Sequence, residues 1–145
     1  MNSIMLPVTL ATAGAAAIIN FWLSMRTSAV RRSEKISIGD GGNARLTARM
    51  RAQANFVEYA PFILILIGLI EFTTGTSTWL WAASAAFLLA RIAHPLGMDG
   101  MPAGRTAGTT VTLVLLLGLA IYAIVLPFMP EKVQNAPVES VLPVG

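Results

Sequence analysis

The chain has 145 residues, of which 55% are hydrophobic and 12% are charged, and its mean hydropathy is +0.69. A soluble globular domain carries about 25% charged residues, and the apolar residues here form long blocks, so we predict an all-α integral membrane protein. The net charge of +3 does not indicate a nucleic-acid partner, because nine of the ten Lys and Arg residues lie in two connections between apolar blocks, from Arg26 to Arg105. The lack of cysteine and the single histidine, His94, leave no thiolate or multi-histidine metal site.

We predict one four-helix transmembrane domain over residues 1–130, followed by an extended C-terminal tail over 131–145. Its first span covers residues 4–25, and because MNSIMLPVTL carries no basic group, we predict a retained span rather than a signal peptide. The next segment, SIGDGGNARL, is typical of a turn followed by a helix start. We expect an Asx-turn at Asp40, positive φ at Gly41 and Gly42, and Asn43 as the N-cap.

The second span covers residues 44–71, begins as an amphipathic helix and becomes wholly apolar after Pro61, which is expected to kink it. The third span covers 77–93, with Trp79 and Trp81 where an interfacial aromatic belt would lie. The fourth covers 106–128, where Gly118 is expected to allow close helix contact.

The charges of the connections predict the orientation. The first connection has seven basic residues against two acids, and the third, RIAHPLGMDGMPAGR, is also basic, so both should face the cytoplasm. The second connection, EFTTGTST, has one acid, Glu71, and should face outward. With four spans, both termini would lie outside the cytoplasm.

The segment RAQANFVEYAPF places polar residues ahead of the apolar run ILILIGLI. On a helix, the spacing puts four of them on one stripe: Arg51, Asn55, Glu58 and Tyr59. A polar stripe entering a membrane span is costly unless it has a role. The stripe is either a packing network, in which Arg51 and Glu58 compensate each other, or a site where a guanidinium binds the carboxylate of a polar ligand.

Arg91 and Arg105 bracket the third connection. Each alone would be explained as a positive-inside anchor. Together with the other basic residues of this face, they require an anionic partner, either lipid headgroups or a polyanionic small molecule. His94, one turn after Arg91, is more simply explained as a hydrogen-bonded interfacial histidine than as a catalytic residue.

The stripe closely resembles the second-helix signature of the MAPEG family, the membrane-associated proteins of eicosanoid and glutathione metabolism. The preceding GDGGN turn is most similar to the bacterial branch, and RIAH and Arg105-Thr106 match the third and fourth helices, so the resemblance covers about residues 4–128. It implies a microsomal glutathione transferase-like homotrimer in a bacterial inner membrane. Glutathione would bind in clefts between subunits near the cytoplasmic face.

The resemblance also implies residue roles. The second-helix residues that hold glutathione are Arg51, Asn55, Glu58 and Tyr59, with Glu58 on its amino group and the arginines on its carboxylates. Arg91 and one of Arg31 or Arg32 match further binding arginines, and Gln53 would reach the ligand from the adjoining subunit. Arg105 matches the arginine that stabilises the thiolate. Tyrosines found after the third-helix arginine in some members are missing here, and His94 is the residue that could replace one of them.

These roles favour a glutathione transferase acting on lipophilic electrophiles that enter from the bilayer, with peroxidase activity towards lipid hydroperoxides as a further option. The alternative is a non-catalytic lipid- or ligand-binding membrane protein of the same fold. A channel or transporter is less well supported, because the charged residues sit at the helix ends rather than midway along the spans.

Overall fold

The computed structural model describes residues 5–129, which form four α-helices and one short 3-10 turn. These elements are α1 (Pro7–Glu34), α2 (Ala44–Thr74), α3 (Thr78–Met98), α4 (Pro102–Val125) and η1 (Leu126–Phe128). All four α-helices are long and apolar enough to cross a membrane, which confirms the predicted all-α class. The predicted tail, 131–145, and the start of the first span at Ile4 lie outside the described residues.

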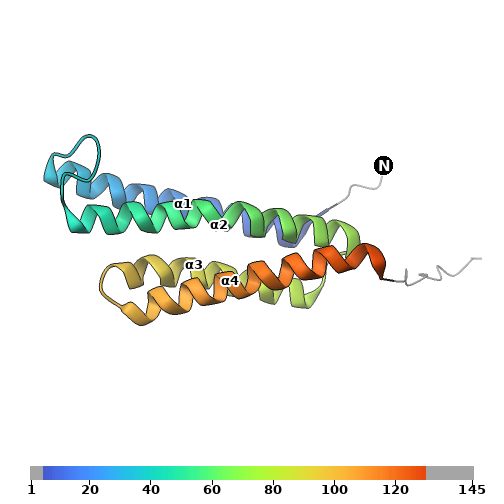
Figure 1. Cartoon of the computed structure of the whole chain (residues 1–145). Coiled ribbons are helices and arrows are strands. Elements are labelled where there is room, and N and C mark those ends of the chain that lie inside the picture. The colour runs from blue at the N-terminus through green and yellow to red at the C-terminus, as the bar shows by residue number, and fades with distance from the viewer. Residues whose placement is uncertain (1–4, 130–145) are drawn as a thin grey trace, which may run out of the picture.

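The helices form two antiparallel hairpins, α1–α2 and α3–α4, that lie side by side (Figure 1). The α1–α2 loop and the α3–α4 turn lie at the same end of the bundle. We call this end the basic end, because the arginines from Arg26 to Arg51 and from Arg91 to Arg105 lie in the helix segments that lead into these connections. The connection between α2 and α3 lies at the opposite end, beside the start of α1.

Turn and cap residues define the α1–α2 loop as predicted. The Gly42 N–H donates to Asp40 Oδ1 at 3.0 Å, and Asn43 Oδ1 accepts from the Leu46 N–H at 2.9 Å as the N-cap of α2. Gly41 and Gly42 have φ values of +57° and +71°. The hydrogen bonds from the Gly42 N–H and the Thr47 hydroxyl hold the pKa of Asp40 below its ordinary value.

All four helices extend beyond the predicted spans at one end, and three of them carry candidate residues in the added part. α3 runs past residue 93 to Met98 and includes His94. α1 continues through Arg31 and Arg32 to Glu34, and α4 begins at Pro102 rather than at residue 106. Proline suits the first turn of a helix, because its fixed φ is helical and the missing N–H needs no partner there. Arg105 therefore lies within the first turn of α4. α2 is one helix from Ala44 to Thr74 and includes Pro61.

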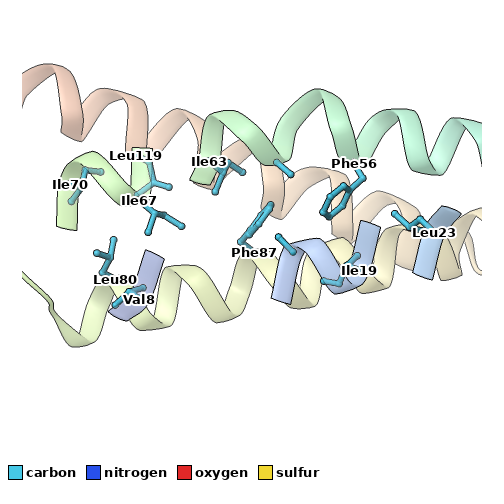
Figure 2. Packing of buried hydrophobic residues seen from close by; sticks show 12 residues of the cluster. Val8, Ile19, Leu23, Phe56, Ile63, Ile67, Ile70, Leu80, Phe87 and Leu119 are labelled. Atoms are coloured by element: carbon cyan, nitrogen blue, oxygen red, sulfur yellow. The ribbon is translucent and has the colours of Figure 1, made fainter. Parts of the chain in front are cut away.

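The hydrophobic core lies along the line where the two hairpins meet (Figure 2). Phe56, Ile63 and Ile67 of α2 face Phe87 and Leu80 of α3, and all are at least 95% buried. Within the described residues, helix α4 contributes one fully buried member, Leu119, and four partly buried residues that pack against the cluster: Leu115, Leu116, Tyr122 and Ala123. The outer side of α4 is apolar and exposed, as in a helix that faces lipid or another subunit.

Glu71, the last residue of the predicted second span, is not the solvated acid that its place beside an outward-facing connection suggested. It lies inside α2 with 1% of its surface exposed. Its Oε1 accepts from the Val8 N–H at 3.0 Å and the Thr76 hydroxyl at 2.9 Å, and its Oε2 accepts from the Thr9 N–H at 2.8 Å and the Thr9 hydroxyl at 2.7 Å. Because α1 has no side-chain cap of its own, Glu71 supplies the acceptors that the first N–H groups of that helix need.

Candidate functional site

The α2 stripe lies near the basic end of the bundle, on the helix that links the core to the α1–α2 loop. Arg51 and Glu58 are exposed, and Asn55 and Tyr59 are half-buried. Within residues 5–129, neither Arg51 nor Glu58 makes a side-chain hydrogen bond or an ion pair, so the compensating pair expected for a packing network is not formed in one chain. The stripe thus presents a cation and an anion, both unpaired, along one face of α2.

Arg91 of α3 lies across from the stripe and is 1% exposed. Its Nη2 donates to Asn55 Oδ1 at 2.9 Å, and its guanidinium carbon is 6.0 Å from the centre of the Phe56 ring. The other buried donors, Nε and Nη1, have no hydrogen-bond partner in the described part of the chain, and no carboxylate there lies within ion-pair distance. A buried guanidinium held by one amide oxygen is poorly compensated and suits an anionic partner.

His94 and Arg105 lie where α3 packs closely on α4. His94 is 4% exposed, and its Nδ1 has no hydrogen-bond partner within residues 5–129, so the expected hydrogen-bonded histidine stays a prediction. The charges of Arg91 and Arg105 both act on the His94 ring. Arg105 is exposed, while its backbone lies directly against Gly97 of α3. The structure therefore brings Arg91, His94 and Arg105 to one region.

The remaining candidates lie on a different face of α2 or on α1. Gln53 is two residues after Arg51, which places it on nearly the opposite side of the helix, where it accepts a hydrogen bond from the Thr27 hydroxyl at 3.4 Å. It lines a cavity of about 520 Å³ between α1 and α2 that also includes Arg31. Within one chain, Gln53 and Arg31 do not join the stripe.

Arg31 and Arg32, left as alternatives by the sequence, are distinguished by their contacts. Arg31 Nη1 donates to the Gly39 carbonyl at 2.9 Å, and its Nη2 lies 3.4 Å from Met50 Sδ, so Arg31 holds the α1–α2 loop against the helices. Arg32 is exposed, and its side chain makes no hydrogen bond in the described part of the chain. Both arginines line a cavity at the end of α1, and of the two only Arg31 has hydrogen-bond partners in the described part of the chain.

One ionic cluster at the basic end was not predicted. Asp99, at the end of α3, forms an ion pair with Arg26 of α1, and its Oδ2 lies 3.6 Å from Nη2 of Arg49 of α2. Arg49 Nη1 also donates to the Arg26 carbonyl at 3.1 Å. The available signal was that Asp99 is the single acid in a basic connection.

The sequence profile of the MAPEG family matches residues 9–125, a range that includes the stripe, Arg91, His94 and Arg105. The chain belongs to the MAPEG family. This family includes glutathione transferases, and the resemblance drawn from the second-helix signature is confirmed at the level of the family.

Two relatives of this MAPEG chain are inner membrane proteins. "Inner membrane protein YecN" of Escherichia coli strain K12 is 33% identical over 69 residues, which cover 47% of this chain and 52% of YecN. The protein of the same name in E. coli O6:H1 matches to the same extent. The match thus spans about half the length of these relatives, whose name gives a location and no activity.

Proposed function

We propose that this MAPEG protein is a membrane glutathione transferase that joins the glutathione thiolate to lipophilic electrophiles, with reduction of lipid hydroperoxides as a second activity. The observation that carries the proposal is buried Arg91, bound to Asn55 and with two unpaired donors beside the stripe. Glutathione has two carboxylates and one amino group. Among residues 5–129, Arg51 and Arg91 have no acidic partner and Glu58 has no basic one, so these three charges complement the groups of glutathione.

The two faces of α2 favour a site shared between copies of the chain. Arg51, Asn55 and Glu58 occupy one face, and Gln53 the opposite one, so a single ligand contacts both sets only when a second copy supplies Gln53. This supports glutathione binding between neighbouring subunits, and the assembly as a homotrimer is what the resemblance to the family implies. Arg32, whose side chain has no partner in residues 5–129, is the α1 arginine we assign to the ligand. Tyr59, one residue after Glu58, completes the stripe on α2.

Arg105 is assigned to the thiolate. A thiol with a pKa of about 8.5 is mostly protonated at neutral pH, and the thiolate is the nucleophile. A guanidinium within hydrogen-bonding reach favours the charged form. The thiolate attacks an electrophilic carbon, a C–S bond forms, and the leaving group departs with the electron pair of the broken bond. His94, whose Nδ1 has no hydrogen-bond partner in residues 5–129, is available to the ligand where other members have a tyrosine.

The location follows the charges and the relatives. Placing the basic end in the cytoplasm satisfies the positive-inside rule and sets both termini outside the cytoplasm. Together with the E. coli relatives, this favours a bacterial inner membrane. Glutathione would then reach the site from the cytoplasm, and the electrophile from the bilayer.

The division of roles predicts that Arg51→Ala and Arg105→Ala behave differently. Loss of one charge-assisted contact by Arg51→Ala should weaken glutathione binding by about 10- to 100-fold. Arg105→Ala should abolish the thiolate absorbance band and turnover while binding changes little. Ultraviolet difference absorbance and calorimetric titration of the detergent-solubilised protein measure the two quantities. Equal losses of binding and turnover in both variants would contradict the assignment.

Arg91→Met separates a binding role from a packing role. Replacing a buried, poorly compensated charge by an apolar side chain of similar length is often neutral or stabilising. We therefore expect the unfolding temperature without glutathione to equal or exceed that of the wild type, and the rise in that temperature on adding glutathione to disappear. Arg45→Met, at an exposed arginine of α2, is the control and should retain the glutathione-dependent rise. A fall in stability without glutathione would assign Arg91 to packing instead.

The second candidate function is non-catalytic binding of an anionic lipid. A cavity of about 650 Å³ at the end of α1 combines Arg32 and Lys35 with the apolar Met25 and Ile36, a composition that suits a lipid headgroup and the start of its chain. If this is the activity, glutathione produces no thiolate band in the wild-type protein.

A further inference from the structure

We infer that Asp99 is a positioning residue, which ties the α3–α4 hairpin to α1 and α2 and thereby fixes Arg105 relative to the α2 stripe. Its effect on turnover rests on the proposed function. The link through Asp99, which we call the tether, does not rest on it, because it concerns only the distance between the α3–α4 hairpin and helices α1 and α2.

Asp99 is the meeting point of three helices at the basic end. It belongs to the end of α3, forms an ion pair with Arg26 of α1, and lies 3.6 Å from the guanidinium of Arg49 of α2. The side chains of Arg26 and Arg49 are 12% and 15% exposed and that of Asp99 is 31% exposed, so the guanidinium groups of this pairing are sheltered while the carboxylate stays in contact with solvent. Arg26 is held further by stacking on the Trp22 ring, 4.7 Å from its centre.

Without the Asp99 carboxylate, the same cluster would repel itself. The charge of Arg45 acts on both Arg26 and Arg49. Asp99 is the single acid in ion-pair contact with this group among residues 5–129. Because three cations repel one another around a single anion, the Asp99 carboxylate is the group that keeps the end of α3 against α1 and α2.

The tether reaches Arg105 through a short, closely packed turn. Asp99 and Gly100 donate backbone hydrogen bonds to Leu96 and Gly97, at 3.2 Å and 3.3 Å, and α4 begins at Pro102. Gly97 lies so near the Arg105 backbone that the last turn of α3 and the first turn of α4 move together. On the other side, Arg49 precedes Arg51 by two residues in α2. Asp99 thus sets the separation between the stripe and Arg105 without contacting either ligand-facing group.

The test replaces Asp99 by the isosteric, neutral asparagine. Because the chain has no cysteine, Ile38→Cys in the α1–α2 loop and Met101→Cys in the α3–α4 turn can carry a spin-label pair. Both residues are exposed, at 89% and 58%. Co-expression with excess unlabelled chain leaves one labelled copy per assembly, so that the measured distance is the one within a chain.

We expect Asp99→Asn to lengthen and broaden the distance between the labels. It should lower kcat by about 10- to 100-fold, as for a displaced catalytic group, and raise the pKa of bound glutathione towards that of the free thiol. Glutathione affinity should fall by much less than kcat, since the contact between Arg91 and Asn55 lies about two turns along α3 from Asp99 and is expected to persist. Asp99→Glu, which keeps the charge, should recover most of the turnover. Glu34→Gln, at an exposed acid with no partner in residues 5–129, is the matched control and should change none of these quantities.

The outcomes separate the two hypotheses. Unchanged label distances and kcat in Asp99→Asn would overturn the inference, and so would a loss of turnover with an unchanged distance. If the wild-type protein forms no thiolate with glutathione, the proposed function fails, and the label distance alone decides whether Asp99 is the tether.

Discussion

Replacing Gly97 with alanine is expected to push α3 and α4 apart and to abolish turnover. A Cβ at this position would lie 1.9 Å from Arg105 N and 2.6 Å from both Arg105 Cα and Gly104 C. These are backbone atoms of a helix, which cannot rotate aside as a flexible side chain can. The helices must therefore shift, at a cost of at least about 1–3 kcal/mol in the free energy of unfolding. Because the shift acts on the backbone of Arg105 itself, the thiolate should be lost along with stability.

Gly118→Ala is the matched control for Gly97→Ala. Gly118 is exposed on α4, the helix that Gly97 of α3 packs against, and no atom within 4 Å would meet an added Cβ. Alanine there should leave stability unchanged or raise it by up to about 1 kcal/mol through helix propensity. Thermal unfolding in detergent and thiolate absorbance are measured for both variants. Wild-type behaviour of Gly97→Ala would show that α4 can move without affecting Arg105.

The contrast between these glycines shows what sequence periodicity can and cannot predict. The apolar blocks predicted four long helices, and turn chemistry predicted the loop at Asp40 and Asn43. The sequence also contains Gly104 and Gly108, one turn apart, but it does not reveal which face of α4 meets α3. In the structure, an added Cβ on Gly108 would lie 2.6 Å from the Ala90 carbonyl oxygen. The predicted close contact at Gly118 is wrong within the described chain.

The α2 stripe is the part of the candidate site that could be predicted from the sequence. Arg51, Asn55, Glu58 and Tyr59 lie on one helix, so the 3.6-residue period alone places them together. The contact between Asn55 and Arg91 depends on the register between α2 and α3, which local spacing does not determine.

Glu71 and Asp99 were missed for a related reason. Each is an isolated acid in a connection, a pattern that is usually solvated. Their partners, the α1 N-terminus and the arginines at 26 and 49, are brought to them only by tertiary packing.

Glu71→Gln is expected to destabilise the protein by about 2–4 kcal/mol in the free energy of unfolding. The carboxylate accepts two hydrogen bonds on each oxygen, including those from the Val8 and Thr9 N–H groups. Glutamine has the same shape but replaces one oxygen with an NH₂ group. Whichever way the amide is oriented, one of these backbone N–H groups then faces another donor. In a buried site at a helix N-terminus, that unpaired group and the lost negative charge both disfavour the fold.

Glu58→Gln provides the comparison for Glu71→Gln, measured without glutathione. It makes the same chemical change in the same helix at an exposed residue whose side chain has no partner in residues 5–129, so it should leave stability unchanged. Thr76→Val, which removes only one of the four donors, should cost less than Glu71→Gln, about 1 kcal/mol. Unfolding by denaturing detergent gives the three values. Since Glu71 lies at the opposite end from Arg91 and Arg105, folded Glu71→Gln protein should still form the glutathione thiolate. Equal stability of the Glu71 and Glu58 variants would show that α1 does not need the carboxylate as its cap.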